Sequence, residues 1–254
     1  MPARLALRIS AVSLLLVAPF AARAEGAGEK LRAAYPDFVD RVDGNTLVMT
    51  SGRRLTIDDG RAKSFDQRLA DPDLEDMFAD PYPRGAKVTP PAKDADPGRY
   101  RNGAFFDAVY GDCRKGEVTK NLVAVPWVPK WGGGTVRFSS RAGAAEALAA
   151  VSKELEAGPP AWKKFLVPSA GTYNCRVIAG TNRVSAHGWG IAIDVATDKS
   201  DYWYWSDPTG RKVAYKNRIP GEIAEVFERH GFVWGAKWYH YDTMHFEYRP
   251  EILR

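Results

Sequence analysis

Two short stretches in the C-terminal third of the sequence constrain the fold most, because both carry metal-ligating side chains. The first is Ser185–Asp194, with the sequence SAHGWGIAID, and the second is Asp242–Glu247, with the sequence DTMHFE. Two imidazoles and one carboxylate can bind zinc while leaving a fourth position for water. The natural set is His187, Asp194 and His245. A fold that uses this set must bring the two stretches together.

The chain must also turn between His187 and Asp194 if both are to reach one ion. A fully extended chain would separate these residues by about 23 Å. Gly188 and Gly190 permit the turn, because glycine adopts backbone conformations that other residues avoid. A single His-x6-Asp pair is a weak signal, so the metal-site hypothesis depends on both stretches together.

A water molecule activated by zinc needs a base, and Asp242 is the candidate. It lies three residues before His245, close enough to sit beside the ion without binding it. Zinc lowers the pKa of its bound water to about 7, so a carboxylate can take the proton at neutral pH. The negative oxygen of the tetrahedral intermediate then needs a positive group. Arg176 is the candidate for that group, with Arg183 behind it.

The other histidines and Glu247 allow different interpretations. His240 could replace His245, although it lies in a loop-like run. His230 continues the apolar face of an expected helix at its C-terminal end, where packing and the helix dipole account for it. Glu247 shares a strand face with His245 and could accept a hydrogen bond from that imidazole. The alternative for Glu247 is a surface salt bridge.

Four consecutive aromatic residues, Tyr202–Trp205, could line a groove for a glycan or a peptide. Large aromatic side chains usually fill cores. We therefore expect packing to be the role of at least half of the run.

The remaining pattern predicts an α+β fold, because helices mix with short strands without a repeating strand–helix rhythm. Six prolines within 71–98 exclude long helices there. Ser140 is the expected N-cap of a helix that buries Leu148, Val151 and Leu155. The expected elements are hairpins over 46–57 and 122–138, helices over 101–110, 140–157 and 221–230, and strands over 190–195 and 244–248.

Residues 1–24 have the three parts of a secretory signal peptide. Arg4 and Arg8 give a positive start, 9–20 is an uncharged and mostly apolar run, and Ala22–Ala24 is a small-x-small cleavage site. The apolar run is 12 residues long, shorter than the ~20 residues that span a bilayer. The alternative is an uncleaved interfacial anchor. We expect an exported, most simply periplasmic protein, without stable membrane insertion after cleavage.

Cleavage after Ala24 changes the charge of the chain. The cleavage removes three arginines and no acidic residue, which lowers the formal net charge from +5 to +2. A nearly neutral protein gives little support to nucleic-acid binding.

Export also changes what is expected of the cysteines. In an oxidising compartment, a disulfide between Cys113 and Cys175 is plausible. Two separate buried thiols are the alternative.

Together, the two stretches resemble a known family. The pattern Ser185-x-His187-x-x-Gly190-x-Ala192-x-Asp194, followed by Asp242-x-x-His245-Phe246-Glu247, is similar to that of the D-alanyl-D-alanine carboxypeptidase and L-alanyl-D-glutamate peptidase family of zinc peptidases. This family shares its fold with the vancomycin-resistance dipeptidases and the hedgehog signalling domain. The approach over 171–183 also resembles exported bacterial members, so the likeness covers roughly 170–250.

The resemblance implies a fold and a set of roles. It implies a hedgehog-like zinc peptidase domain over 136–254, preceded by an N-terminal accessory region over 25–135 that is rich in hairpins and carries no assigned motif. The base is Asp242 where carboxypeptidase members usually have Glu, which is more like the L-alanyl-D-glutamate endopeptidase branch. Thr243-Met244 replaces the Pro or Trp often seen before the last histidine. The implied roles are Zn²⁺ ligands for His187, Asp194 and His245, base for Asp242, anion stabilisation for Arg176 and substrate contact for Ser185.

Three hypotheses for function follow. The leading one is an exported zinc metallopeptidase that cleaves peptidoglycan stem peptides as an endopeptidase of L-alanyl-D-glutamate or D,D type, with D-alanyl-D-alanine carboxypeptidase as its alternative. The second is a thiol hydrolase that uses Cys175 with His187 and Asp194. The third is a non-catalytic cell-wall binding module on the same fold. Such a module has no need of a base, so Asp242 favours an enzyme.

Overall fold

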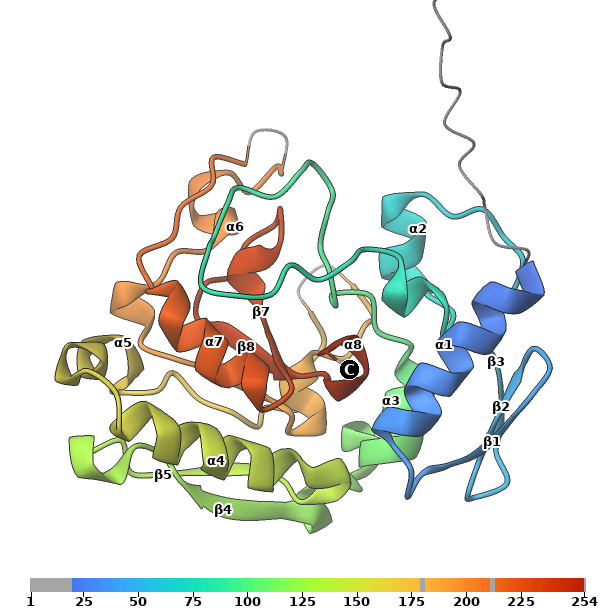
Figure 1. Ribbon diagram of the computed structural model, residues 1–254, viewed down its shortest axis with the longest axis horizontal. Helices are drawn as coiled ribbons and strands as arrows, with labels where there is room; N and C mark the ends of the chain where they lie inside the picture. Colours follow the sequence, from blue (N-terminus) through green and yellow to red (C-terminus); the bar gives the residue numbers. More distant parts are fainter. Residues whose placement is uncertain (1–19, 179–180, 211–212, 254) are drawn as a thin grey trace, which may run out of the picture.

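The computed structural model describes residues 20–178, 181–210 and 213–253. Within these ranges, three small antiparallel sheets pack with helices, so the predicted α+β class is confirmed (Figure 1). The expected signal peptide lies outside the described residues except for 20–24, which begin helix α1 (Phe20–Ala34). None of the helices in these ranges combines the length and the apolar character that a membrane crossing requires.

Short strands and helices are interspersed along the rest of the described chain. They are β1 (Val39–Asp43), β2 (Thr46–Met49), β3 (Arg54–Thr56), α2 (Phe65–Ala70), α3 (Gly103–Tyr110), β4 (Leu122–Pro126), β5 (Thr135–Ser139), α4 (Ala144–Glu156), α5 (Lys163–Leu166), β6 (Ala192–Asp194), α6 (Trp203–Ser206), α7 (Gly221–Arg229), β7 (Phe232–Trp234), β8 (His245–Tyr248) and α8 (Pro250–Leu253).

Both predicted hairpins are confirmed. Strand β2 pairs with β1 and β3 in one sheet, with Leu47 opposite Leu55, and β4 pairs with β5, with Val125 opposite Val136. Each pairing sets apolar side chains of neighbouring strands against each other, which stabilises a short hairpin. The proline-rich part of the chain forms only a single 3-10 turn, Asp76–Phe78, as its composition predicts.

Helix α4 buries Leu148, Val151 and Leu155 as predicted, but it begins four residues later than Ser140. The prediction that Ser140 caps this helix is wrong. Its hydroxyl donates a hydrogen bond to the carbonyl of Asn121 at 2.9 Å, and its N–H donates to the same oxygen at 2.8 Å. Ser140 therefore closes the loop beside β4. A separate turn over 141–143 intervenes before the helix starts.

The third sheet places the second metal-binding stretch at its centre. Its order is β6-β8-β7, and all pairs are antiparallel. The register sets Asp194 directly opposite His245, and residues opposite each other in an antiparallel pair have Cα atoms about 5 Å apart. Helix α7 covers this sheet (Figure 1), with Phe227 stacked on Phe246 at a centroid distance of 3.8 Å.

The buried apolar cluster runs from Ala24 to Tyr248 and includes residues on both sides of position 135. Tyr35 contacts Phe105 edge-on, with ring centroids 5.2 Å apart, and Phe106 stacks on Trp189 at 4.9 Å. Helix α1 also packs against α8 (Figure 1). The N-terminal region is thus packed directly against the region that carries the metal-binding stretches.

A disulfide between Cys113 and Cys175 ties the turn after α3 to the segment before the first metal-binding stretch, with Cα atoms 5.6 Å apart. A Cβ on Gly188 would lie 3.2 Å from Sγ of Cys113 and 2.6 Å from Cγ1 of Val184, so the turn beside His187 needs glycine there. With Cys175 oxidised, the thiol-hydrolase hypothesis is wrong for this structure, because a disulfide sulfur is not a free nucleophile.

We expect that replacing both cysteines, in the double variant Cys113→Ser/Cys175→Ser, lowers the free energy of unfolding. The bridge spans 62 residues, and closing a loop of that length stabilises a fold by about 4 kcal/mol in the chain-entropy model. Urea denaturation of the variant and of the native chain measures the difference. Thiol titration of the denatured, unreduced native protein is the companion measurement, and two reactive thiols would contradict the bridge.

Candidate metal centre

His187 is positioned by a 3-10 turn, Ala186–Trp189, that ends at Gly190 with a φ of 68°. A positive φ of this kind favours glycine. The Nδ1 atom of His187 donates a hydrogen bond to the carbonyl of Thr172 at 2.5 Å. Thr172 is itself anchored, because its hydroxyl donates to the carbonyl of Arg137 on β5 at 2.7 Å. The ring orientation is therefore fixed, and Nε2 is the atom left for a ligand role.

The backbone N–H and the backbone carbonyl of Asp194 both form hydrogen bonds. Asp194 pairs with His245 across β6 and β8, and its N–H donates to the carbonyl of Gly171 at 2.9 Å. Its carbonyl accepts from the N–H of Ala170 at 2.8 Å. The carboxylate is thereby aimed at both imidazoles.

Three ligand atoms converge where these elements meet. Nε2 of His187 lies 3.2 Å from Oδ2 of Asp194 and 3.2 Å from Nδ1 of His245, and that Nδ1 lies 3.0 Å from Oδ1 of Asp194. A tetrahedral zinc ion with bonds of 2.0–2.1 Å holds its ligand atoms about 3.4 Å apart. The three side chains form one of the residue groups whose ligand atoms could hold a metal ion. Their donor types and spacing fit zinc.

The charges of the site also suit a cation. Burial would raise the pKa of Asp194, but the adjacent His187 and His245 hold it well below its ordinary value. Burial would lower the pKa of His245, but its hydrogen bonds to Asp194 and Glu247 raise it to about 9. Without a metal, these acidic groups attract a proton to the imidazole. A bound cation would take the place of that positive charge.

Asp242 completes the group, next to the ligands but not among them. Its N–H donates to the carbonyl of Gly235 at 3.0 Å, and its own carbonyl accepts from the N–H of His245 at 3.2 Å. Its Oδ1 atom is buried and has no hydrogen-bond partner within the described ranges. Burial, together with the charge of Asp194, raises the pKa of Asp242. A buried polar atom without a partner indicates a missing one, and water in the metal centre would supply it.

Glu247 supports the far side of the His245 ring. Its Oε2 atom accepts a hydrogen bond from Nε2 of His245 at 3.3 Å, and the whole residue is buried. Arg101 binds the carboxylate through two nitrogens, with Nε 2.6 Å from Oε1, and Arg249 approaches Oε1 at 3.2 Å. Burial would raise the pKa of Glu247, but Arg101 above all holds it well below its ordinary range. A surface salt bridge is therefore the wrong interpretation for this residue.

Two cavities flank the candidate ligands. One, of about 90 Å³, is lined by Ser185, Asp242 and Tyr202 among others, and the other, of about 240 Å³, lies on the side of Tyr173. His187, Asp194 and Arg176 line both. Arg176 is exposed, so its guanidinium can reach a substrate from solvent. Arg183, which we expected behind Arg176, lines neither cavity.

The two remaining histidines have partners of their own. Nδ1 of His240 lies 3.0 Å from Oδ2 of Asp96, and its ring stacks on Phe65. It lines the smaller cavity without joining the ligand atoms, so the proposal that it replaces His245 is wrong. Nε2 of His230 lies 2.7 Å from Oε2 of Glu154, away from the site.

The aromatic run is divided between the cavity and the surface. Tyr202 lines the smaller cavity, and Trp203 contacts the ring of His240 at 5.0 Å. Tyr204 and Trp205 are 50% and 57% exposed. Half of the run therefore packs, and the other half is accessible to a ligand.

Sequence reasoning missed several residues of the centre. Arg99, Arg101 and Trp238 line the smaller cavity. Arg101 comes from the N-terminal region, and nothing in the spacing of the sequence connects it with Glu247. Arg249 lies two residues after Glu247 and could have been suspected from its opposite charge.

We expect Glu247→Ala to weaken zinc binding about 10- to 100-fold, because an acceptor behind a ligating histidine orients the ring and raises its basicity. Competition against a chromophoric chelator measures the affinity. Glu228→Ala is the matched control, since Glu228 is also buried and ion-paired, with Lys237 at 2.6 Å, but lies outside the centre. Equal losses in both variants would show that the effect is general destabilisation.

Comparison with known proteins agrees with this geometry. No curated protein and no solved structure matches the chain. A match to the model of a peptidase family supports a peptidase. The matched segment contains all three candidate ligands and Asp242. Residues 179–248 match the family model described as D-alanyl-D-alanine carboxypeptidase, and this confirms the resemblance predicted from the sequence.

Proposed function

We propose that this chain is an exported zinc metallopeptidase that hydrolyses peptide bonds in peptidoglycan stem peptides. The observation that carries the proposal is the convergence of His187, Asp194 and His245 within 3.2 Å, beside the unpaired carboxylate oxygen of Asp242. The family match over 179–248 supports the same chemistry. Export is proposed from residues 1–24 alone.

The residues divide into those that hold the metal and those that act on the substrate. His187, Asp194 and His245 would hold the zinc ion, which would act as a Lewis acid and lower the pKa of a water molecule to near neutral. Oδ1 of Asp242 accepts that proton and can return it to the departing amine. The raised pKa of Asp242 suits a group that must both take and release a proton.

Arg176 and Ser185 act on the substrate side. The N–H of Ser185 donates to the carbonyl of Arg176 at 3.0 Å, and Val177 pairs with Val184, so the two residues face each other across a short ladder. The guanidinium of Arg176 stabilises the oxygen that becomes negative when the peptide carbonyl is attacked. Ser185 is buried at the wall of the smaller cavity, where it contacts the bound peptide.

The two cavities favour cleavage inside a peptide. Both include Arg176, His187 and Asp194, so substrate residues can be accommodated on either side of the scissile bond. An endopeptidase is the activity that uses such an arrangement. Removal of a terminal D-alanine is the second candidate, and the description of the matched family favours it. The unpaired oxygen of Asp242 argues against a module that only binds.

We expect about one zinc ion per chain, and loss of that ion in His187→Ala and His245→Ala, because three protein ligands are needed to retain the metal. Metal analysis after dialysis measures zinc per chain. His230→Ala is the matched control and keeps its zinc, since that ring is paired with Glu154 instead. Full occupancy in both ligand variants would overturn the metal assignment.

We expect Asp242→Asn to keep its zinc and its fold while turnover falls by at least ~10²–10⁴-fold, the usual contribution of a general base. Mass spectrometry of muropeptides after digestion measures the rate and also identifies the bond. An endopeptidase cuts within the stem peptide and leaves two shorter peptides with new termini, whereas a carboxypeptidase releases only D-alanine. Near-normal hydrolysis by a zinc-loaded Asp242→Asn variant would remove this residue from the mechanism.

A further inference from the structure

We infer that Arg183 anchors a second binding site, which takes a carboxylate of an acidic peptide at a distance from the scissile bond. The site is a cavity between the N-terminal region and the segment that leads into the metal-binding turn. The identity of the ligand rests on the proposed function, since stem peptides are the acidic peptides that this chain is proposed to cleave.

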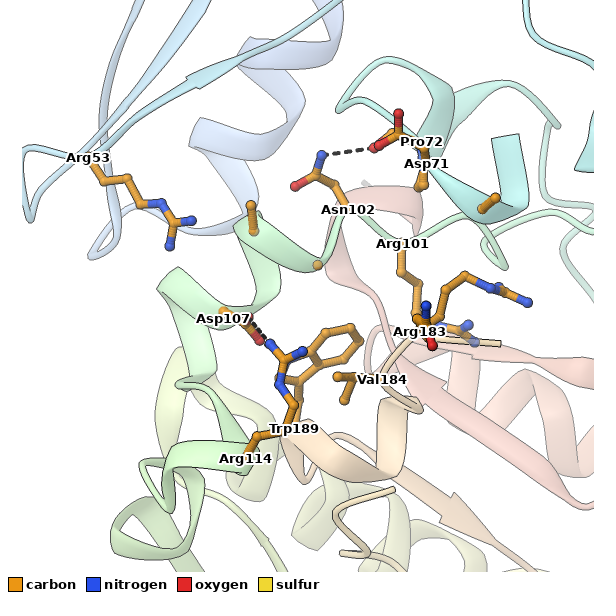
Figure 2. A pocket seen from close by; sticks show the side chains of 14 residues that line it. Arg53, Asp71, Pro72, Arg101, Asn102, Asp107, Arg114, Arg183, Val184 and Trp189 are labelled. Carbon is orange, nitrogen blue, oxygen red and sulfur yellow. Dashed lines mark hydrogen bonds and ion pairs between the residues drawn. The ribbon is translucent and has the colours of Figure 1, made fainter. Parts of the chain in front are cut away.

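The cavity has a volume of about 370 Å³, and its charged lining residues include more arginines than carboxylates. Its walls come from the turn between β2 and β3, the end of α2, the start of α3 and residues 182–184, with Trp189 contributing from the 3-10 turn (Figure 2). In this view Arg183 and Arg101 stand at one rim and Arg53 at the opposite one. The charged lining residues are Arg53, Arg101, Arg114, Arg183, Asp71 and Asp107.

Both carboxylates in the lining already have partners. Asp107 accepts hydrogen bonds from Nε1 of Trp189 at 2.8 Å and from Arg114 at 3.3 Å, and Asp71 pairs with Arg61 at 2.7 Å. Arg101 is bound to Glu247. Neither acidic side chain is therefore left to neutralise Arg183.

Arg183 is the partly buried cation of the lining that has no carboxylate partner among the described residues, whereas Arg53 across the cavity is exposed. Arg183 is half-buried, and none of the carboxylates in the described ranges lies within ion-pair distance of its guanidinium. Burial, together with the nearby Arg101 and Arg99, lowers the pKa of Arg183 to about 10. A partly desolvated cation beside other cations is unfavourable unless an anion binds. A planar guanidinium fits a carboxylate through two parallel hydrogen bonds.

The position of the cavity suits a peptide that extends from the metal centre. Arg101 lines both this cavity and the smaller cavity beside the metal ligands. A further pocket of about 440 Å³ shares Ala70, Asn182 and Arg183 with it. A substrate bound over His187 can thus place a neighbouring carboxylate against Arg183.

The test compares an acidic stem peptide with the same peptide in which every carboxylate is a carboxamide. Binding is measured by calorimetry on the zinc-loaded full chain carrying Asp242→Asn, so that hydrolysis does not consume the peptide. We expect the acidic peptide to bind about 10- to 100-fold more tightly, the range of one hydrogen-bonded charge. Adding Arg183→Gln should remove this preference while leaving the affinity for the amidated peptide unchanged.

Two further variants and one further anion sharpen the result. Arg183→Lys keeps the charge and should retain part of the preference. Arg41→Gln is the matched control, because Arg41 is an exposed arginine on β1 that pairs with Asp40, and it should change neither affinity. Inorganic phosphate should compete only weakly with the acidic peptide. Phosphate that bound as tightly as this peptide would overturn the assignment to a carboxylate.

The inference would be overturned if the two peptides bound with equal affinity, or if Arg183→Gln lowered the affinity for both peptides equally. Hydrolysis by the unsubstituted chain is measured separately. Its absence would contradict the proposed function alone, whereas the lack of an acid preference in the chain that keeps Arg183 would contradict only the role of Arg183. Melting temperature and zinc content of each variant show that the fold and the metal centre are intact.

Discussion

The arrangement of the site depends on the hydrogen bond and the ion pairs that the buried carboxylate of Glu247 makes. On one side the carboxylate accepts a hydrogen bond from His245, and on the other it is bound by Arg101 and Arg249. Arg249 in turn binds Glu251, which accepts a hydrogen bond from Tyr35 at 2.7 Å. A fully buried charge is tolerated only when it is paired in this way. The orientation of one ligand is therefore coupled to side chains from both ends of the chain.

The same coupling explains why the N-terminal region is part of the site. It contributes Arg99 and Arg101 to the smaller cavity, and its hairpin, α2 and α3 wall the arginine-lined one. The disulfide from Cys113 packs against the turn that presents His187. Without this region the three candidate ligands would remain, but Glu247 would keep only Arg249 and His245 as partners and the arginine-lined cavity would lose one wall. If the proposed function holds, the N-terminal region contributes to substrate selection and the third sheet carries two of the three candidate ligands.

The candidate metal centre brings together like groups whose proximity is unfavourable. Asp194 and Asp242 are two carboxylates in one buried place, and the charge of Asp194 helps to raise the pKa of Asp242. Two imidazole nitrogens face each other at 3.2 Å. Without a metal, the raised pKa of His245 lets a proton relieve this crowding, and a bound cation would do the same. The crowding of like groups is thus a physical reason to propose metal binding and proton transfer at the same place.

Most of the elements and the types of the candidate ligands could be predicted from the amino-acid sequence, because both depend on local pattern. Turn residues between short apolar runs predicted the hairpins, and the two short stretches predicted three ligands and a base. Local pattern misplaced the cap at Ser140, because a turn over 141–143 that depends on the β4–β5 hairpin precedes the helix. The pairing of Arg101 with Glu247 and the position of Arg183 in a separate cavity could not be predicted, because both depend on tertiary packing. Contacts between residues 146 positions apart arise from packing of the whole core, which no local spacing encodes.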